Sequence, residues 1–196
     1  MQNNIIVEKY NPGWVSHFKH LKSILSNALA DLDCIFEHVG STSVPGLSAK
    51  PIVDLDIIFE EPCERKIIIK RLERLGYKHL GELGIEGRDA FELTENVSTL
   101  LSNYCHNLYV CQKDCLALQN HLKFRDYLRE NPTEAYNYGI LKMELAKLFP
   151  NDIDSYVQQK TPFITQILSN LDLSEEAISQ ICIQNDWQKD EKVNAT

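Results

Sequence analysis

Residues 37–59 read EHVGSTSVPGLSAKPIVDLDIIF. The stretch begins as a short strand, continues through small residues and turn formers, and ends in an aliphatic, β-branched strand that starts at Pro51. Side chains of a strand alternate between its two faces. One face of this second strand is wholly apolar and belongs against a core: Val53, Leu55, Ile57 and Phe59.

The opposite face of the same strand carries two acids, Asp54 and Asp56. Two strand rises of about 3.3 Å place them about 6.6 Å apart. The two carboxylates repel until a cation lies between them, and Mg²⁺ or Mn²⁺ prefers oxygen ligands. The pattern therefore predicts a metal site at Asp54 and Asp56. The alternative is a solvent-facing edge strand with ordinary surface aspartates.

A Gly-Ser pair precedes this strand, with twelve residues between Ser41 and Asp54. Gly40 permits close approach of backbone N–H groups to phosphate oxygens, and Ser41 adds a hydroxyl donor. The order strand, Gly-Ser turn and Asp-x-Asp strand predicts a phosphate cradle beside a metal site. Such geometry serves phosphoryl or nucleotidyl transfer.

The Gly-Ser pair followed by Asp54-Leu55-Asp56 resembles the signature of the nucleotidyltransferase superfamily, which has a DNA polymerase beta-like fold. Residues 37–54 as a whole closely resemble the hallmark of the GrpB family, a group within that superfamily. The resemblance covers roughly residues 5–170. Its further matches are residues 10–14, 106–110, 124–129, 138–142 and 160–164.

The resemblance implies an α+β fold: a nucleotidyltransferase-like mixed β-sheet with flanking helices and a C-terminal helical segment. It also implies transfer of a nucleoside monophosphate from a nucleoside triphosphate to an unknown small-molecule or protein acceptor. Mg (or Mn) bound by Asp54 and Asp56 would be the cofactor.

The superfamily completes its site with a third carboxylate on a later strand. Glu92, in Phe91-Glu92-Leu93, has the right local pattern, and His106 is the other catalytic candidate. Tyr109 stands where the family often has His. A missing third acid leaves two alternatives open: a nucleotide or phosphometabolite binding module without transfer, and an interaction protein that keeps the fold.

Six residues are candidates for phosphate contacts. Arg88, expected in a Gly-rich loop over residues 80–90, could clamp phosphate bidentately. Lys142, on the helical side, could reach across a cleft. For the two lysines, the alternative is simple exposure to solvent. The full set is Gly40, Ser41, Ser43, Lys50, Arg88 and Lys142.

The order of elements supports the α+β class, because strands mixed with helices come first and helices alone follow. Strands are expected at 5–7, 34–39, 90–93 and 106–111, with a turn at 95–102. Helices are expected from Pro12, from Pro62 and in several segments after Lys113, with a kink or break at Pro162. We expect a core over residues 1–112, packed helices over 113–170, and a short helix with a polar tail over 171–196.

Composition limits the partners. The 196 residues are 43% hydrophobic, and 20 Lys and Arg against 28 Asp and Glu give a net charge of −8. This acidic balance disfavours long nucleic acid. No apolar run reaches the roughly eighteen residues of a membrane span, and no basic N-terminal region precedes an apolar one, so we expect a cytoplasmic protein without a membrane partner.

Six cysteines without a Cys-x-x-Cys pair are expected to be thiols. Cys105, His106, Cys111 and Cys115 could form a zinc cluster, although their spacing fits no common template. The alternative is that these cysteines act as small buried apolar residues.

Overall fold

The computed structural model describes residues 4–94, 100–171 and 173–186. One five-stranded sheet has the order β1-β2-β5-β4-β3, in which β2 and β5 are parallel and the other neighbours antiparallel. This confirms the predicted mixed sheet. The strands are β1 (Ile35–Val39), β2 (Val53–Phe59), β3 (Tyr77–Gly81), β4 (Arg88–Leu93) and β5 (His106–Gln112).

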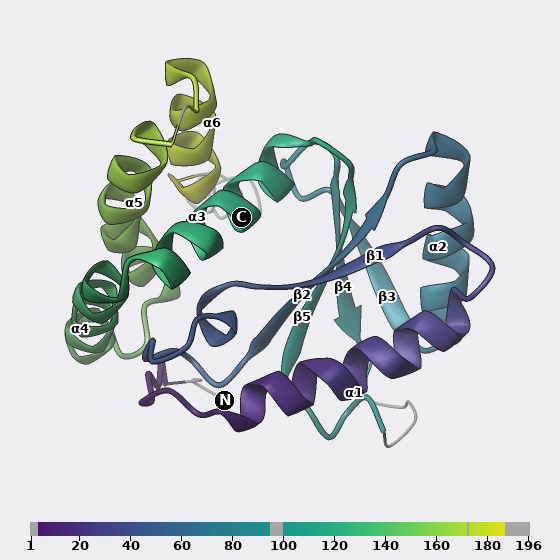
Figure 1. The fold of residues 1–196 in the computed structure, drawn as a ribbon, viewed down its shortest axis with the longest axis horizontal. Helices are drawn as coiled ribbons and strands as arrows, with labels where there is room; N and C mark the ends of the chain where they lie inside the picture. Colours follow the sequence, from purple (N-terminus) through teal and green to yellow (C-terminus); the bar gives the residue numbers. More distant parts are fainter. Residues whose placement is uncertain (1–3, 95–99, 172, 187–196) are drawn as a thin grey trace, which may run out of the picture.

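Helices α1 (Gly13–Ala28) and α2 (Pro62–Arg74) cover one face of the sheet (Figure 1). The four apolar positions of β2 all point into this layer and are at most 3% exposed, as the alternation predicted. They pack against apolar side chains of the two helices, including Trp14, Leu21, Leu25, Ile68 and Leu72. The opposite face of β2, with Asp54 and Asp56, is thereby turned away from this core.

Helix α3 (Leu116–Glu130) packs on that opposite face, where Leu118 contacts Ile58 and Cys111. Helices α4 (Pro132–Leu148), α5 (Ile153–Ser169) and α6 (Glu175–Asp186) lie together at one side of the sheet (Figure 1). Helix α5 runs through Pro162 without a break.

The loop between β1 and β2 joins the sheet to these helices. Val44 and Leu47 are buried in a second cluster with side chains of α3, α4 and α5. Val44 and Leu47 therefore anchor this loop, and they hold the Gly-Ser turn between the two layers.

Several predicted elements differ from the structure. Residues 5–7 form no strand, and the next residue, Glu8, forms a single antiparallel bridge with Ala49. The predicted loop over 80–90 was wrong at both ends, because β3 extends to Gly81 and β4 begins at Arg88. The strand predicted at 90–93 is the larger part of β4, and its first two residues, Arg88 and Asp89, were missed because they are polar. The expected turn at 95–102 falls partly on residues 95–99, outside the described chain.

Candidate functional site

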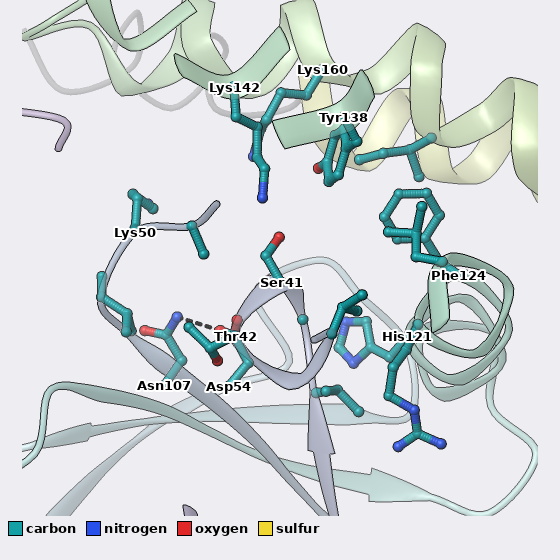
Figure 2. A pocket seen from close by; sticks show the side chains of 18 of the residues that line it. Ser41, Thr42, Lys50, Asp54, Asn107, His121, Phe124, Tyr138, Lys142 and Lys160 are labelled. Atoms are coloured by element: carbon teal, nitrogen blue, oxygen red, sulfur yellow. Dashed lines mark hydrogen bonds between the residues drawn. The ribbon is translucent and has the colours of Figure 1, made fainter. Parts of the chain in front are cut away.

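A cavity of about 290 Å³ lies between the Asp54 end of the sheet and helices α3, α4 and α5. Figure 2 shows its polar side chains converging from the loop, the sheet and the helices. Those that carry the argument below are Ser41, Lys50, Asp54, Asn107, Lys142 and Lys160.

Gly40 and Asp54 touch at the floor of this cavity. Gly40 has φ +65°, which L side chains rarely adopt, and a Cβ built on it would lie 2.1 Å from Oδ2 of Asp54. Asn107 donates its amide to Oδ1 of Asp54 at 2.7 Å (Figure 2). Burial raises the pKa of Asp54 above its usual value, against the effect of this hydrogen bond. Glycine is thus required here for both conformation and space.

The Ser-Thr-Ser turn after Gly40 divides its hydroxyl groups between two tasks. Ser43 donates its hydroxyl to the Gly40 carbonyl at 2.6 Å, and Thr42 is hydrogen-bonded to His38 at 3.0 Å. Ser41 instead points its hydroxyl into the cavity, toward Lys142 (Figure 2). Of the two predicted serine contacts, only Ser41 lines the cavity.

Two arginines of α3 contact the backbone around this turn, and Arg125 also lines the cavity. Arg125 is 8% exposed; it forms an ion pair with Glu37 and donates to the His38 carbonyl at 3.1 Å. Arg129 donates to the Ser43 carbonyl at 3.0 Å. The sequence motif around residues 124–129 therefore has a positioning role that the spacing alone did not reveal.

Asp56 is placed differently from Asp54. It is fully buried, and Nδ1 of His121 on α3 donates to its Oδ2 at 2.8 Å. Burial opposes protonation of His121, but the Asp56 charge and this hydrogen bond raise the His121 pKa above its ordinary value. Oδ1 of Asp56 has no hydrogen-bond partner within the described residues. His121 lines the cavity, whereas Asp56 lies behind it.

Three lysines from three elements surround the space in front of Asp54: Lys50 before β2, Lys142 on α4 and Lys160 on α5 (Figure 2). Lys142 is 2% exposed, and its ammonium has no hydrogen-bond partner in the described chain. Burial, then the charge of Lys160, lowers the pKa of Lys142 well below its ordinary value. Burial and the charge of Lys50 lower the pKa of Lys160 to about 8. The cavity therefore brings three basic side chains together, and burial opposes the charged form of two of them, Lys142 and Lys160.

Sequence reasoning missed Lys160 and His121. Both lie on ordinary amphipathic helices, and their convergence depends on how α3 packs on the sheet and how α5 packs beside α3 and α4. The family resemblance did include residues 160–164, but that match assigned no role to Lys160.

Three other candidates do not line the cavity. Arg88 lies on β4, not in a loop, with its guanidinium 4.5 Å from the Tyr109 ring centre. Glu92 lines a neighbouring depression over β4 and β5. His106 accepts from the Tyr77 hydroxyl at 2.6 Å and donates to the Tyr104 carbonyl at 2.7 Å. It is in register with Val53, on the core-facing side of the sheet.

The donor chemistry of the floor fits a divalent cation. Asp54 and Asp56 share one face of β2, and Oδ1 of Asp56 is a buried carboxylate oxygen that a cation would satisfy. Among the described residues, no three His, Cys, Asp or Glu side chains already converge as a metal site. Within the described chain, the site therefore offers Asp54 on the cavity floor and Asp56 behind it, without a third acid.

The zinc alternative gains no support from the geometry. Cys105 is exposed and Cys111 is buried, and all six cysteines are free thiols. Within the described ranges, no helix is both long and apolar enough to cross a membrane.

Comparison with known proteins agrees with the geometry. The profile of the family described as GrpB protein matches residues 4–170. The glutamate-rich protein GrpB of Alkalihalophilus pseudofirmus is 30% identical over 171 residues, which cover 87% of this chain and 97% of that protein. The UPF0157 protein YqkA of Bacillus subtilis is 34% identical over 155 residues, 79% of this chain and 43% of that protein.

Solved structures show the fold. The crystal structure of the conserved protein GrpB from Enterococcus faecalis superposes with a TM-score of 0.72 at 37% identity, covering 89% of this chain and 98% of that one. Cid1 poly(U) polymerase, crystallised with MgGTP bound, gives a TM-score of 0.50 at 17% identity, covering 72% of this chain and 44% of that one. The fold is accordingly nucleotidyltransferase-like.

Proposed function

This chain belongs to the GrpB family, and from its fold and its lysine-lined cavity we propose that it binds a nucleoside triphosphate and transfers the nucleoside monophosphate to a small-molecule or protein acceptor. Cid1, which shares the fold, is a polymerase crystallised with MgGTP. That likeness supports the reaction class and leaves the acceptor open.

One observation carries the proposal: the ammonium of Lys142 is buried without a hydrogen-bond partner in the described residues, beside Lys160. Removing a charge from water costs several kcal/mol per ion unless a partner compensates. Two like charges at one place increase that cost. A ligand with several negative charges, such as a triphosphate, would supply what the folded chain lacks.

Each side chain then has a role that follows from its position. Lys50, Lys142 and Lys160 would neutralise phosphate oxygens, and Ser41 would donate a hydroxyl to one of them. Asp54 and Asp56 would hold Mg²⁺ or Mn²⁺, which supplies charge neutralisation at the reacting phosphate.

Binding is tested by calorimetry with nucleoside triphosphates in Mg²⁺ or Mn²⁺. At one hundred times the dissociation constant, a ligand adds about 2.7 kcal/mol of stability, so thermal shift gives a second readout. We expect Lys142→Gln, and separately Asp54→Asn with Asp56→Asn, to abolish metal-dependent binding while the far-UV spectrum stays native. Lys147→Gln, an exposed lysine on the same helix, is the matched control. Wild-type affinity in the carboxylate double variant would contradict the metal assignment.

A binding module without transfer is the second candidate. It is favoured because neither Glu92 nor His106 lines the cavity and because Asp56 is already engaged by His121. Release of pyrophosphate from a bound triphosphate, in the presence of a pool of candidate acceptors, distinguishes the two functions. If Glu92 or His106 acts in transfer, replacing it with Ala lowers turnover far more than nucleotide affinity. Binding without pyrophosphate release selects the module.

A further inference from the structure

The aromatic rings of the cavity have little free surface for a nucleobase. Nζ of Lys142 lies 4.5 Å from the centre of the Tyr138 ring, and Phe163 stacks on Tyr138 at 5.0 Å. Phe124 meets Tyr138 edge to face at 5.3 Å. A base entering here would have to displace a lysine or another ring.

The two remaining tyrosines of the lining are occupied in a similar way. Both Lys160 and Lys50 lie over the Tyr156 ring, at 4.5 Å and 5.9 Å from its centre. Arg88 lies over Tyr109 at 4.5 Å. Cation–π contact and base stacking need the same ring face. The three tyrosine rings therefore hold cations in place, which leaves Phe124, in edge-to-face contact with Tyr138, as the one remaining Phe, Tyr or Trp ring of the described lining.

Amide side chains are the other usual means of reading a base edge. In the described lining, Asn107 already donates its amide to Asp54 at 2.7 Å. Asn120, on α3, is the remaining amide. One amide without a stacking partner gives weak discrimination among four bases.

The size of the cavity also argues against enclosure of a nucleobase. Pockets that enclose whole small molecules measure about 300–1,000 Å³, and this cavity of about 290 Å³ lies at the lower limit. Lys142 points toward Ser41 above Asp54 (Figure 2), and Lys50 and Lys160 line the same cavity. The space suits a phosphate chain with its cation, while the base would remain outside.

We infer that this cavity recognises the phosphate chain of its ligand and does not read the nucleobase, so its ligand class is polyphosphates and polyphosphate monoesters as a whole. The inference rests on the proposed function, because it specifies the ligand of the same site. It goes beyond that function in assigning recognition to Lys50, Lys142 and Lys160, with no base-selective residue.

The test is calorimetric titration of the full chain with ATP, GTP, CTP, UTP and inorganic tripolyphosphate at one fixed Mg²⁺ concentration. We expect the four nucleotides to bind within about threefold of one another, and tripolyphosphate within about tenfold of them, a difference of about 1.4 kcal/mol. Lys160→Gln should weaken all five ligands by a common factor, and Asn120→Ala should leave their ratios unchanged. Lys147→Gln, exposed on α4, should change nothing.

Three outcomes would overturn the inference in distinguishable ways. One nucleotide that binds more than about tenfold tighter than the other three shows base reading, and loss of that preference in Asn120→Ala would assign it to Asn120. Nucleotide binding without tripolyphosphate binding shows that sugar or base is required. In both cases the proposed function stands. Failure of all five ligands to bind overturns the inference and the proposed function together.

Discussion

Gly40 and Lys142 are each expected to lower the stability of the ligand-free fold, and each contributes directly to the cavity. Gly40 brings the backbone against Asp54, where any side chain would clash, and Lys142 holds a charge away from water. Residues that lower the free energy of unfolding of the ligand-free protein are expected at functional sites, where ligand binding offsets their cost. Substitution at these two positions therefore separates stability from binding.

Replacing Gly40 with Ala should abolish triphosphate binding. The new Cβ would collide with the Asp54 carboxylate and force it from the cavity floor, in addition to a backbone strain of roughly 1–2 kcal/mol at positive φ. Gly46→Ala is the matched control, because Gly46 has φ +80° but nothing within 4 Å of its Cβ position. Urea denaturation should show a loss of stability in both variants, and calorimetry a loss of binding only in Gly40→Ala. Equal binding by the two variants would mean that the Gly40–Asp54 contact is unimportant.

Replacing Lys142 with Met should stabilise the ligand-free protein while removing triphosphate binding. Met keeps the length of the side chain and removes a buried ammonium without a hydrogen-bond partner, whose desolvation costs more than the roughly 1–3 kcal/mol of a neutral polar group. Urea denaturation measures the gain, and Lys147→Met on the exposed side of α4 controls for composition. A less stable Lys142→Met protein would show that the ammonium has a compensating partner.

Among the elements, α3 does most to shape the site. It supplies His121 to Asp56, Arg125 to the end of β1 and Arg129 to the Ser43 carbonyl. The Gly-Ser turn is thus fixed by a helix that follows it by more than seventy residues in the chain. A change on α3 can alter the turn without touching the ligand.

Replacing Arg129 with Ala tests this positioning. Its two hydrogen bonds to the Ser43 carbonyl would be lost, at a cost of roughly 0.5–1.5 kcal/mol each. We expect weaker triphosphate binding through a less ordered turn, with secondary structure unchanged. Arg74→Ala, at an exposed position near the end of α2, serves as the control. The turn does not depend on α3 if Arg129→Ala and Arg74→Ala bind alike.

The same dependence explains what the sequence could predict. The apolar alternation of β2 and the Gly-Ser motif have local signatures, so β2, Gly40 and Asp54 could be placed from the pattern. Strand β3 could not, because Lys78 and His79 interrupt its apolar pattern. The pairing of His121 with Asp56 depends on helix packing, which no local pattern encodes.

Across the whole molecule, charge is segregated. The chain carries a net charge of −8, yet its cavity gathers three lysines. On the far side of the sheet, the buried Asp89 is compensated instead, by Arg65 at 2.6 Å and His79 at 2.7 Å. In the described chain, the buried carboxylate of Asp89 is therefore paired with two basic side chains, whereas the buried ammonium of Lys142 at the cavity has no hydrogen-bond partner.

The lysine cluster should give the ligand-free protein an unusual dependence of stability on pH. The pKa of Lys160 falls from 10.5 to about 8 on folding, and that of Lys142 falls as well. Between pH 8 and about 10 the unfolded chain binds more protons at Lys160 than the folded one, so Lys160 destabilises the fold fully at pH 7 and progressively less above pH 8. The lowered pKa of Lys142 acts in the same direction.

The measurement is urea denaturation of wild type and of the variant carrying both Lys142→Met and Lys160→Met, from pH 7 to pH 9.5. Other titrating groups affect both proteins, so the difference between their free energies of unfolding isolates the two lysines. We expect the variant to exceed wild type most at pH 7 and the difference to shrink as the pH rises. Saturating tripolyphosphate should stabilise wild type and not the variant, because its negative charge compensates the two ammonium groups. A difference in free energy of unfolding that stays constant across this pH range would mean that both lysines keep ordinary pKa values in the fold. In that case burial would not disfavour their charged forms, and the argument that the cavity needs an anionic ligand would fail.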